Sequence, residues 1–154
     1  MQSMHQKIFK DWLYIFKTLS LESNAYLKEI IYERNLKNQD IAERIRDIVG
    51  RDEVICDSAE PKSIEELYRL GINAKPATKG RDSILNGIDI LKRYKIHVVN
   101  SSNLKREFRT YKWSTDKNGN SLQKPIGPDH LMDALRYVAL IHLKKHNRGW
   151  YAIR

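Results

Sequence analysis

The sequence contains almost none of the residues that form covalent cross-links. Cys56 is the only cysteine among 154 residues, which excludes a disulfide within the chain and predicts a reducing compartment. The cysteine-rich and HExxH patterns of zinc sites are absent, and so is the GxxxxGK(S/T) loop of nucleotide-driven motors. Cys56 lies in a short apolar run, which favours a buried, unreactive thiol over a catalytic nucleophile.

Long apolar runs are also absent. No stretch approaches the roughly 20 residues that a membrane-spanning helix needs, and Met1–Lys10 lacks the pattern of a signal peptide. We therefore expect no membrane partner. No repeat and no linker rich in Pro, Gly or Ser divides the chain, so a single globular domain is predicted.

Acidic residues are in the minority. The chain has 19 Asp and Glu against 28 Lys and Arg, a net charge of +9. A surplus of this size indicates an anionic partner, most often nucleic acid, although a basic surface can also serve solubility alone.

The apolar residues predict alternating helices and strands. Residues 5–20 have helical spacing, whereas residues 25–33 are rich in β-branched and aromatic side chains and predict a strand. Further helices are expected at 38–50, 61–70, 82–94, 104–111 and 129–145, further strands at 53–56, 73–77 and 95–99, and a hairpin turn at Asn118-Gly119. This alternation indicates an α/β fold with a substantially parallel sheet.

Two acidic positions are candidates for chemistry. Asp57 follows the predicted strand at 53–56, and ligand sites of α/β sheets lie beyond the carboxyl ends of strands. It can instead cap the helix that begins at Pro61. In PDHLMDALRY (128–137), His130 and Asp133 share a helical face, and Asp129 can cap that helix. The alternative for Asp133 is an exposed side chain on an amphipathic helix.

These oxygen ligands suit Mg²⁺ or Mn²⁺ better than zinc. Cations near the acids are candidate contacts to nucleic acid, and those of residues 105–112 interleave with aromatic residues, although a solvated helix face gives the same pattern. The candidate DNA-binding residues are Lys62, Lys79, Arg81, Lys105, Arg106, Arg109 and Lys112.

Four motifs occur in order along the chain: DSAEPKSI (57–64), KGRDSI (79–84), KIHV (95–98) and HLMDALRY (130–137). With them, the chain from about Tyr26 to about Leu140 resembles the nuclease domain of tailed-phage terminase large subunits. The resemblance implies an RNase H-like fold, a mixed sheet flanked by helices, with acidic residues around two divalent ions, Mg²⁺ or Mn²⁺.

The resemblance also implies roles for individual residues. Asp57 matches the family's second strand-borne acid, which bridges the metals, and Asp133 matches the acid of the last helix. His130 matches a histidine near the metals, and Asp129 is an adjacent acid that can assist. The implied function is metal-dependent hydrolysis of double-stranded DNA during genome packaging in the bacterial host cytoplasm. The implied partners are the terminase small subunit, the portal protein and an ATPase domain not present in this chain.

The first 24 residues depart from the family pattern. The family begins with a strand that carries another metal-binding aspartate, and here only Asp11, in the run with helical spacing, is similar. We therefore expect an atypical helical segment at 1–24, a nuclease domain at 25–146 with a truncated or remodelled N-terminal strand region, and a tail at 147–154. The alternative function is a catalytically impaired remnant that binds only DNA or a packaging partner. A resolvase-like or RNA–DNA hybrid nuclease on the same fold is a third possibility.

Overall fold

The computed structural model describes residues 2–8, 12–127 and 130–144. A six-stranded sheet has the order β5-β4-β1-β2-β3-β6, and β7 and β8 form a separate hairpin. The strands are β1 (Gln2–Ile8), β2 (Trp12–Leu21), β3 (Asn24–Arg34), β4 (Val54–Cys56), β5 (Ala74–Pro76), β6 (Lys95–Val99), β7 (Lys112–Thr115) and β8 (Ser121–Ile126). The helices are α1 (Asn38–Val49), α2 (Pro61–Arg69), α3 (Ser83–Leu91), α4 (Ser102–Thr110), α5 (His130–Val138) and the π-helical turn η1 (Ala139–Leu143).

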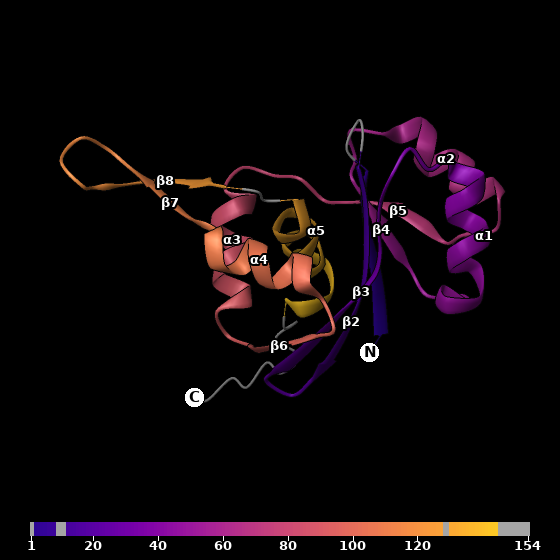
Figure 1. The fold of residues 1–154 in the computed structure, drawn as a ribbon, viewed down its shortest axis with the longest axis horizontal. Helices are drawn as coiled ribbons and strands as arrows, with labels where there is room; N and C mark the ends of the chain where they lie inside the picture. Colours follow the sequence, from indigo (N-terminus) through magenta and orange to yellow (C-terminus); the bar gives the residue numbers. More distant parts are fainter. Residues whose placement is uncertain (1, 9–11, 128–129, 145–154) are drawn as a thin grey trace, which may run out of the picture.

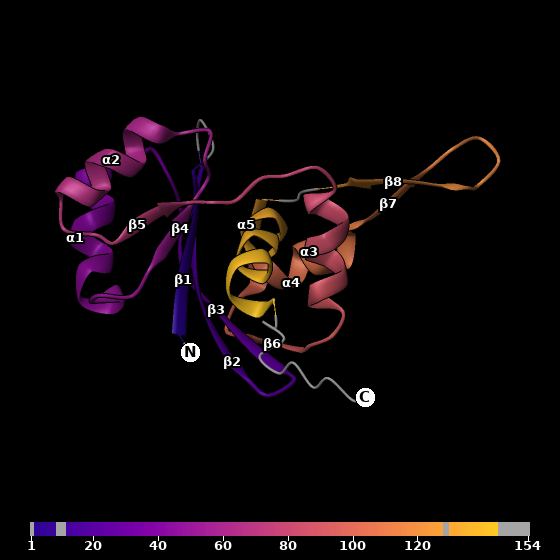
Figure 2. The same ribbon diagram turned by 180° about the vertical axis from the view of Figure 1, so that it is seen from behind.

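The sheet is mixed and covered on both faces. β1, β2 and β3 pair antiparallel, whereas β4 pairs parallel with β1 and β5, and β6 pairs parallel with β3. Helices α1 and α2 lie on one face, and α3, α4 and α5 lie on the other (Figures 1 and 2). The β7–β8 hairpin extends away from this body. In the ranges described, no helix has the length and apolar character that crossing a membrane requires.

The predicted helix at residues 5–20 is wrong. Residues 2–8 and 12–21 form β1 and β2, which pair with each other and lie in the middle of the sheet. The N-terminal strand region is therefore present and belongs to the same sheet as the rest. The elements predicted from Ala25 onward are confirmed to within a few residues, as far as the described residues extend. The predicted tail at 147–154 lies outside them.

Leu27 and Ile31 of β3 lie on opposite faces of the sheet because the pairing of β3 with β2 is irregular. Opposite the step from Ile15 to Phe16, β3 contains one extra residue, Ile30. Side chains alternate along a strand, so one inserted residue reverses the face that follows. Leu27 accordingly packs in the core with α3, α4 and α5, whereas Ile31 packs in the core with α1 and α2.

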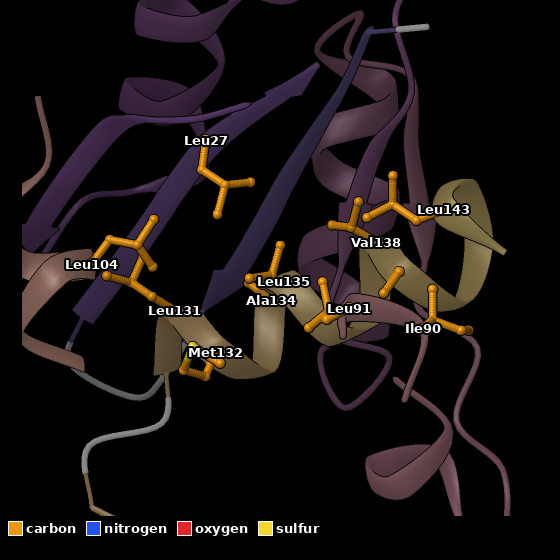
Figure 3. Close-up of a cluster of buried hydrophobic side chains, with 11 residues drawn as sticks. Leu27, Ile90, Leu91, Leu104, Leu131, Met132, Ala134, Leu135, Val138 and Leu143 are labelled. Carbon is orange, nitrogen blue, oxygen red and sulfur yellow. The ribbon is translucent and has the colours of Figure 1, made fainter. Parts of the chain in front are cut away.

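Each face therefore has its own apolar core. The core beside α1 and α2 contains Ile31, Ile41, Ala42, Ile45, Val49, Val54, Cys56, Leu67, Ile72 and Ala74. The core beneath α3, α4 and α5 contains Leu27, Ile90, Leu91, Leu104, Leu131, Met132, Ala134, Leu135, Val138, Ala139 and Leu143 (Figure 3). Helix α5 contributes more residues to the second core than any other element. Its packing against the sheet and the neighbouring helices therefore fixes the position of α5.

Helix α5 begins at a buried carboxylate that α4 supplies. Glu107 is 2% exposed, and its Oε2 accepts hydrogen bonds from the N–H groups of Leu131 at 2.8 Å and Met132 at 3.2 Å. The first N–H groups of a helix have no acceptor within the helix, and a carboxylate also favours the positive end of the helix dipole. Glu107 thus determines where the helix carrying His130 and Asp133 begins.

We predict that Glu107→Ala lowers the free energy of unfolding by about 2–4 kcal/mol, because two buried N–H groups lose their acceptor. Urea denaturation followed by circular dichroism measures the loss. The control is Glu65→Ala, which removes an exposed ion pair with Arg69 and should change stability by less than about 1 kcal/mol. Equal losses in the two variants would contradict the capping role.

The thiol of Cys56 should be unreactive in the folded chain. Cys56 is 2% exposed, and burial, reinforced by the charge of Asp57, raises its pKa to about 12. A disulfide reagent at pH 8 should therefore modify Cys56 only after urea unfolds the chain, when the thiol recovers a pKa of about 8.5. Fast modification without denaturant would show that the strand end opens readily.

Candidate metal centre

Asp57 lies at the carboxyl end of β4, whose three residues are all buried. It is 8% exposed, and its Oδ1 accepts hydrogen bonds from the Ala59 N–H at 2.9 Å and from Lys79 Nζ at 2.5 Å. The bond to Ala59 closes a turn, whereas the residue before α2 is Glu60, so Asp57 does not cap that helix. Within the described part of the chain, nothing bonds to Oδ2, and this oxygen is available to a ligand.

Lys79 lies between β5 and α3 and joins Asp57 to α5. Its Nζ is 5.6 Å from the ring centroid of Tyr137. Burial opposes the charge of Lys79, but the hydrogen bond with Asp57, the interaction with Tyr137 and the charge of Asp57 outweigh burial and raise the pKa of Lys79. Burial and the charge of Asp57 raise the pKa of Tyr137. At neutral pH, a cationic lysine therefore lies between a carboxylate and a neutral phenol.

Asp133 lies one helical turn before Tyr137, so both side chains are on one face of α5. Asp133 forms an ion pair with Arg136, which is only 4% exposed. Gly87 of α3 makes room for this arginine, because a Cβ at that position would lie 3.0 Å from the Cβ of Arg136. The packing of α3 against α5 therefore holds the arginine beside Asp133.

Helix α5 packs directly against the strand that ends at Asp57. Tyr137 forms a small buried cluster with Ile55 of β4 and with Ala77. The face of α5 that carries Asp133 is therefore the face turned toward β4. Helix α5 also contacts β1.

The described residues do not form a complete set of metal ligands. Across 2–8, 12–127 and 130–144, no group of three or more His, Cys, Asp or Glu side chains lies close enough to hold a metal ion. Strand β1 contains no Asp or Glu. His130 is half-buried at the first residue of α5, while Asp11 and Asp129 lie outside the described residues. The oxygen donors are thus Asp57 and Asp133, each beside a cation.

The candidate DNA-binding residues fall into three groups. Lys79 and Arg81 lie in the segment beside Asp57, whereas Lys62 lies on α2, across the sheet from α4 (Figure 1). The third group is Lys105, Arg106 and Arg109 on α4 with Lys112 at the start of β7. These residues therefore lie on three separate parts of the chain.

Sequence reasoning missed three residues of this region. Tyr137 and Arg136 belong to the same motif as Asp133, and their spacing of four and three residues on a helix was an available signal. Glu107 gave no local signal, because its partners Leu131 and Met132 are 24 and 25 residues further along the chain.

The chain is similar to phage terminase large subunits. The protein-family model described as "Terminase RNAseH like domain" matches residues 14–140. The large terminase subunit of Bacillus phage SPP1 is 38% identical over 98 residues, which are 60% of this chain and 23% of that protein. The PBSX phage terminase large subunit of Bacillus subtilis strain 168 is 30% identical over 111 residues, 70% of this chain and 26% of that protein. The chain thus spans about a quarter of these curated relatives.

Solved structures show the same architecture. The large-terminase nuclease domain of bacteriophage SPP1 with bound Mn superposes with a TM-score of 0.71 at 27% identity, covering 88% of this chain and 82% of that chain. The large terminase of a thermophilic bacteriophage superposes with a TM-score of 0.72 at 21% identity, covering 92% of this chain and 40% of that chain. The predicted RNase H-like fold is confirmed, and the chain belongs to the terminase RNase H-like domain family.

Proposed function

We propose that this chain is the nuclease domain of a terminase large subunit and that it hydrolyses phosphodiester bonds of double-stranded DNA with divalent cations. The observation that carries the proposal is the placement of Asp57 at the end of β4 and of Asp133 on the face of α5 that packs against β4. The bound Mn in the nuclease domain of phage SPP1 supports a metal-dependent activity.

The donors of this chain fit a hard cation. Both acids offer carboxylate oxygens, which Mg²⁺ and Mn²⁺ prefer, and Asp57 has an oxygen that no described residue occupies. We propose that Asp57 and Asp133 would hold the divalent cations through their carboxylate oxygens, with His130 and Asp129 assisting. Bound cations of this kind activate water and stabilise the charge that develops on phosphate oxygens.

Other residues of the chain prepare this site. Arg136 pairs with the Asp133 carboxylate and holds it in one orientation. Tyr137 fills the space between α5 and β4 and limits the access of water to the Lys79–Asp57 pair. Lys79 bonds to Asp57, and Arg81 lies two residues further along the same segment. We propose that both hold DNA phosphates without reading bases.

The partners follow from the same family likeness and are proposals. They are double-stranded DNA, the terminase small subunit, the portal protein and an ATPase domain, acting in the cytoplasm of a bacterial host. Lys62, Lys105, Arg106, Arg109 and Lys112 stay candidate DNA contacts.

We predict that Asp57→Asn and Asp133→Asn each lower the rate of Mn²⁺-dependent nicking of supercoiled plasmid about a hundredfold or more, because each removes a charged ligand. The matched control is Asp89→Asn, which changes an exposed aspartate paired with Lys92 on α3 and should leave nicking unchanged. Nicking that persists in both site variants would refute the proposed metal ligands.

Lys79→Met should raise Mn²⁺ affinity about three- to tenfold, measured by the loss of the free-ion signal in electron paramagnetic resonance. The reason is that the ammonium of Lys79 competes with a cation for Oδ1 of Asp57. The same substitution should weaken duplex DNA binding. It should also reduce the slope of log affinity against log salt concentration by about one, the value for one lost phosphate contact. Unchanged Mn²⁺ affinity would show that the ion pair does not oppose metal binding.

A binding module without activity is the second candidate, and the composition of β1 favours it. The strand contains no acidic residue, so a family metal ligand is absent there. DNA retention in a filter-binding assay, without nicking at any enzyme level in Mn²⁺, would identify this function. Nicking that depends on Asp57 and Asp133 would exclude it.

A further inference from the structure

Strand β6 has one edge that carries no neighbouring strand in the described part of the chain. It is the last strand in the sheet order and pairs only with β3. The Lys95 N–H donates to the Ser23 carbonyl, just before β3, at 2.7 Å. Backbone groups alternate along a strand, so Lys95, His97 and Val99 face β3, whereas Ile96 and Val98 present their N–H and C=O groups to the open edge.

The side chains of these two outward residues line an apolar groove. A hollow of about 260 Å³ is formed by Ile96 and Val98 together with α4 residues, among them Phe108. A second hollow of about 300 Å³ shares Ile96 and Phe108 and continues the groove toward α3. It is lined by Ile88, Leu91, Lys92, Tyr94, Ile96, Phe108, Tyr111 and Met132.

The charged residues at the rim of this groove are all basic. Lys105 and Arg109 line the first hollow and are exposed, and Lys92 lines the second, where it pairs with Asp89 at 3.6 Å. No acidic residue lines either hollow. An apolar floor between cations matches a peptide that alternates apolar and acidic residues.

We propose that the β6 edge and its groove bind an extended acidic segment of a partner protein, which adds as a strand beside β6. The backbone of Ile96 and Val98 would supply hydrogen bonds, the groove would take every second side chain, and Lys105 and Arg109 would contact the acidic residues. Duplex DNA could use the cations but has nothing to fill the apolar floor. Residues 145–154 contain Lys145, Arg148 and Arg154 and no acid, so their charge does not match the rim.

The experiment uses the full chain and a labelled peptide of alternating valine and glutamate. Fluorescence anisotropy measures binding, and amide hydrogen exchange by NMR locates it. We expect the amides of Ile96 and Val98 to exchange quickly in the free chain and to become protected by the peptide. The amides of His97 and Val99, already bonded to β3, serve as internal controls and should not change. Protection that does not reach Ile96 and Val98 would overturn strand addition.

Two controls distinguish strand addition at this groove from nonspecific binding to a basic surface. A peptide of the same composition with the valines and glutamates in separate blocks should bind at least about tenfold more weakly, because it cannot alternate. The double variant Lys105→Glu with Arg109→Glu should weaken binding about tenfold, whereas Lys62→Glu on α2 should have no effect. Complete displacement of the peptide by duplex DNA, with equal binding of the blocked peptide, would mean a nonspecific basic surface and would sink the proposal. The nicking assay of the Asp57 variant tests only the metal centre. Failure of the proposed function can therefore be distinguished from failure of this proposal.

Discussion

The position of α5 depends on a carboxylate that belongs to another helix. Glu107 of α4 accepts the first N–H groups of α5 inside the core, where an unpaired N–H group would cost free energy. Further along the helix, Arg136 packs against Gly87 and Tyr137 packs against Ile55. The helix is thus fixed at its start and along one face, and the direction in which Asp133 points follows from these contacts rather than from the aspartate itself.

Much of the sheet could be predicted from local patterns, and the part that failed has a physical reason. Some of these elements have local signals in the sequence, such as Pro61 at the first position of α2 and Gly50 directly after α1. Residues 5–20 were read as a helix because their apolar residues recur every three or four positions. Strands in the middle of a sheet that has helices on both faces need not alternate, so periodicity alone cannot separate them from a helix. The extra residue at Ile30 was also invisible, because a bulge depends on the pairing of two strands.

For the candidate site, the acids were predictable and their partners were not. Asp57 and Asp133 belong to motifs, and their placement followed from a strand end and a helix face. Lys79 approaches Asp57 from 22 residues away and was assigned only to DNA contacts. Its ion pair arises because the chain after β5 passes the end of β4, a feature of the topology. The absence of an acid in β1 is already visible in the sequence, but its meaning depends on knowing that residues 2–8 form the strand beside β4.

Each acid of the candidate centre is paired with a cation of the same chain, so the site is close to neutral before any metal binds. A metal bound at the proposed site would therefore displace or share these contacts, and its affinity would depend on how strongly Lys79 and Arg136 hold their partners. Lys79 is partly exposed and can turn toward a phosphate, whereas Arg136 is buried and cannot. Asp133 is consequently the fixed acid, and Asp57 is the one whose partner would change if DNA binds as proposed. The groove at β6 is four strand positions from β4 in the sheet order, roughly 19 Å at 4.8 Å per strand. That separation lets a partner occupy the far edge of the sheet without touching Asp57, so binding there and the chemistry proposed for Asp57 can be altered independently.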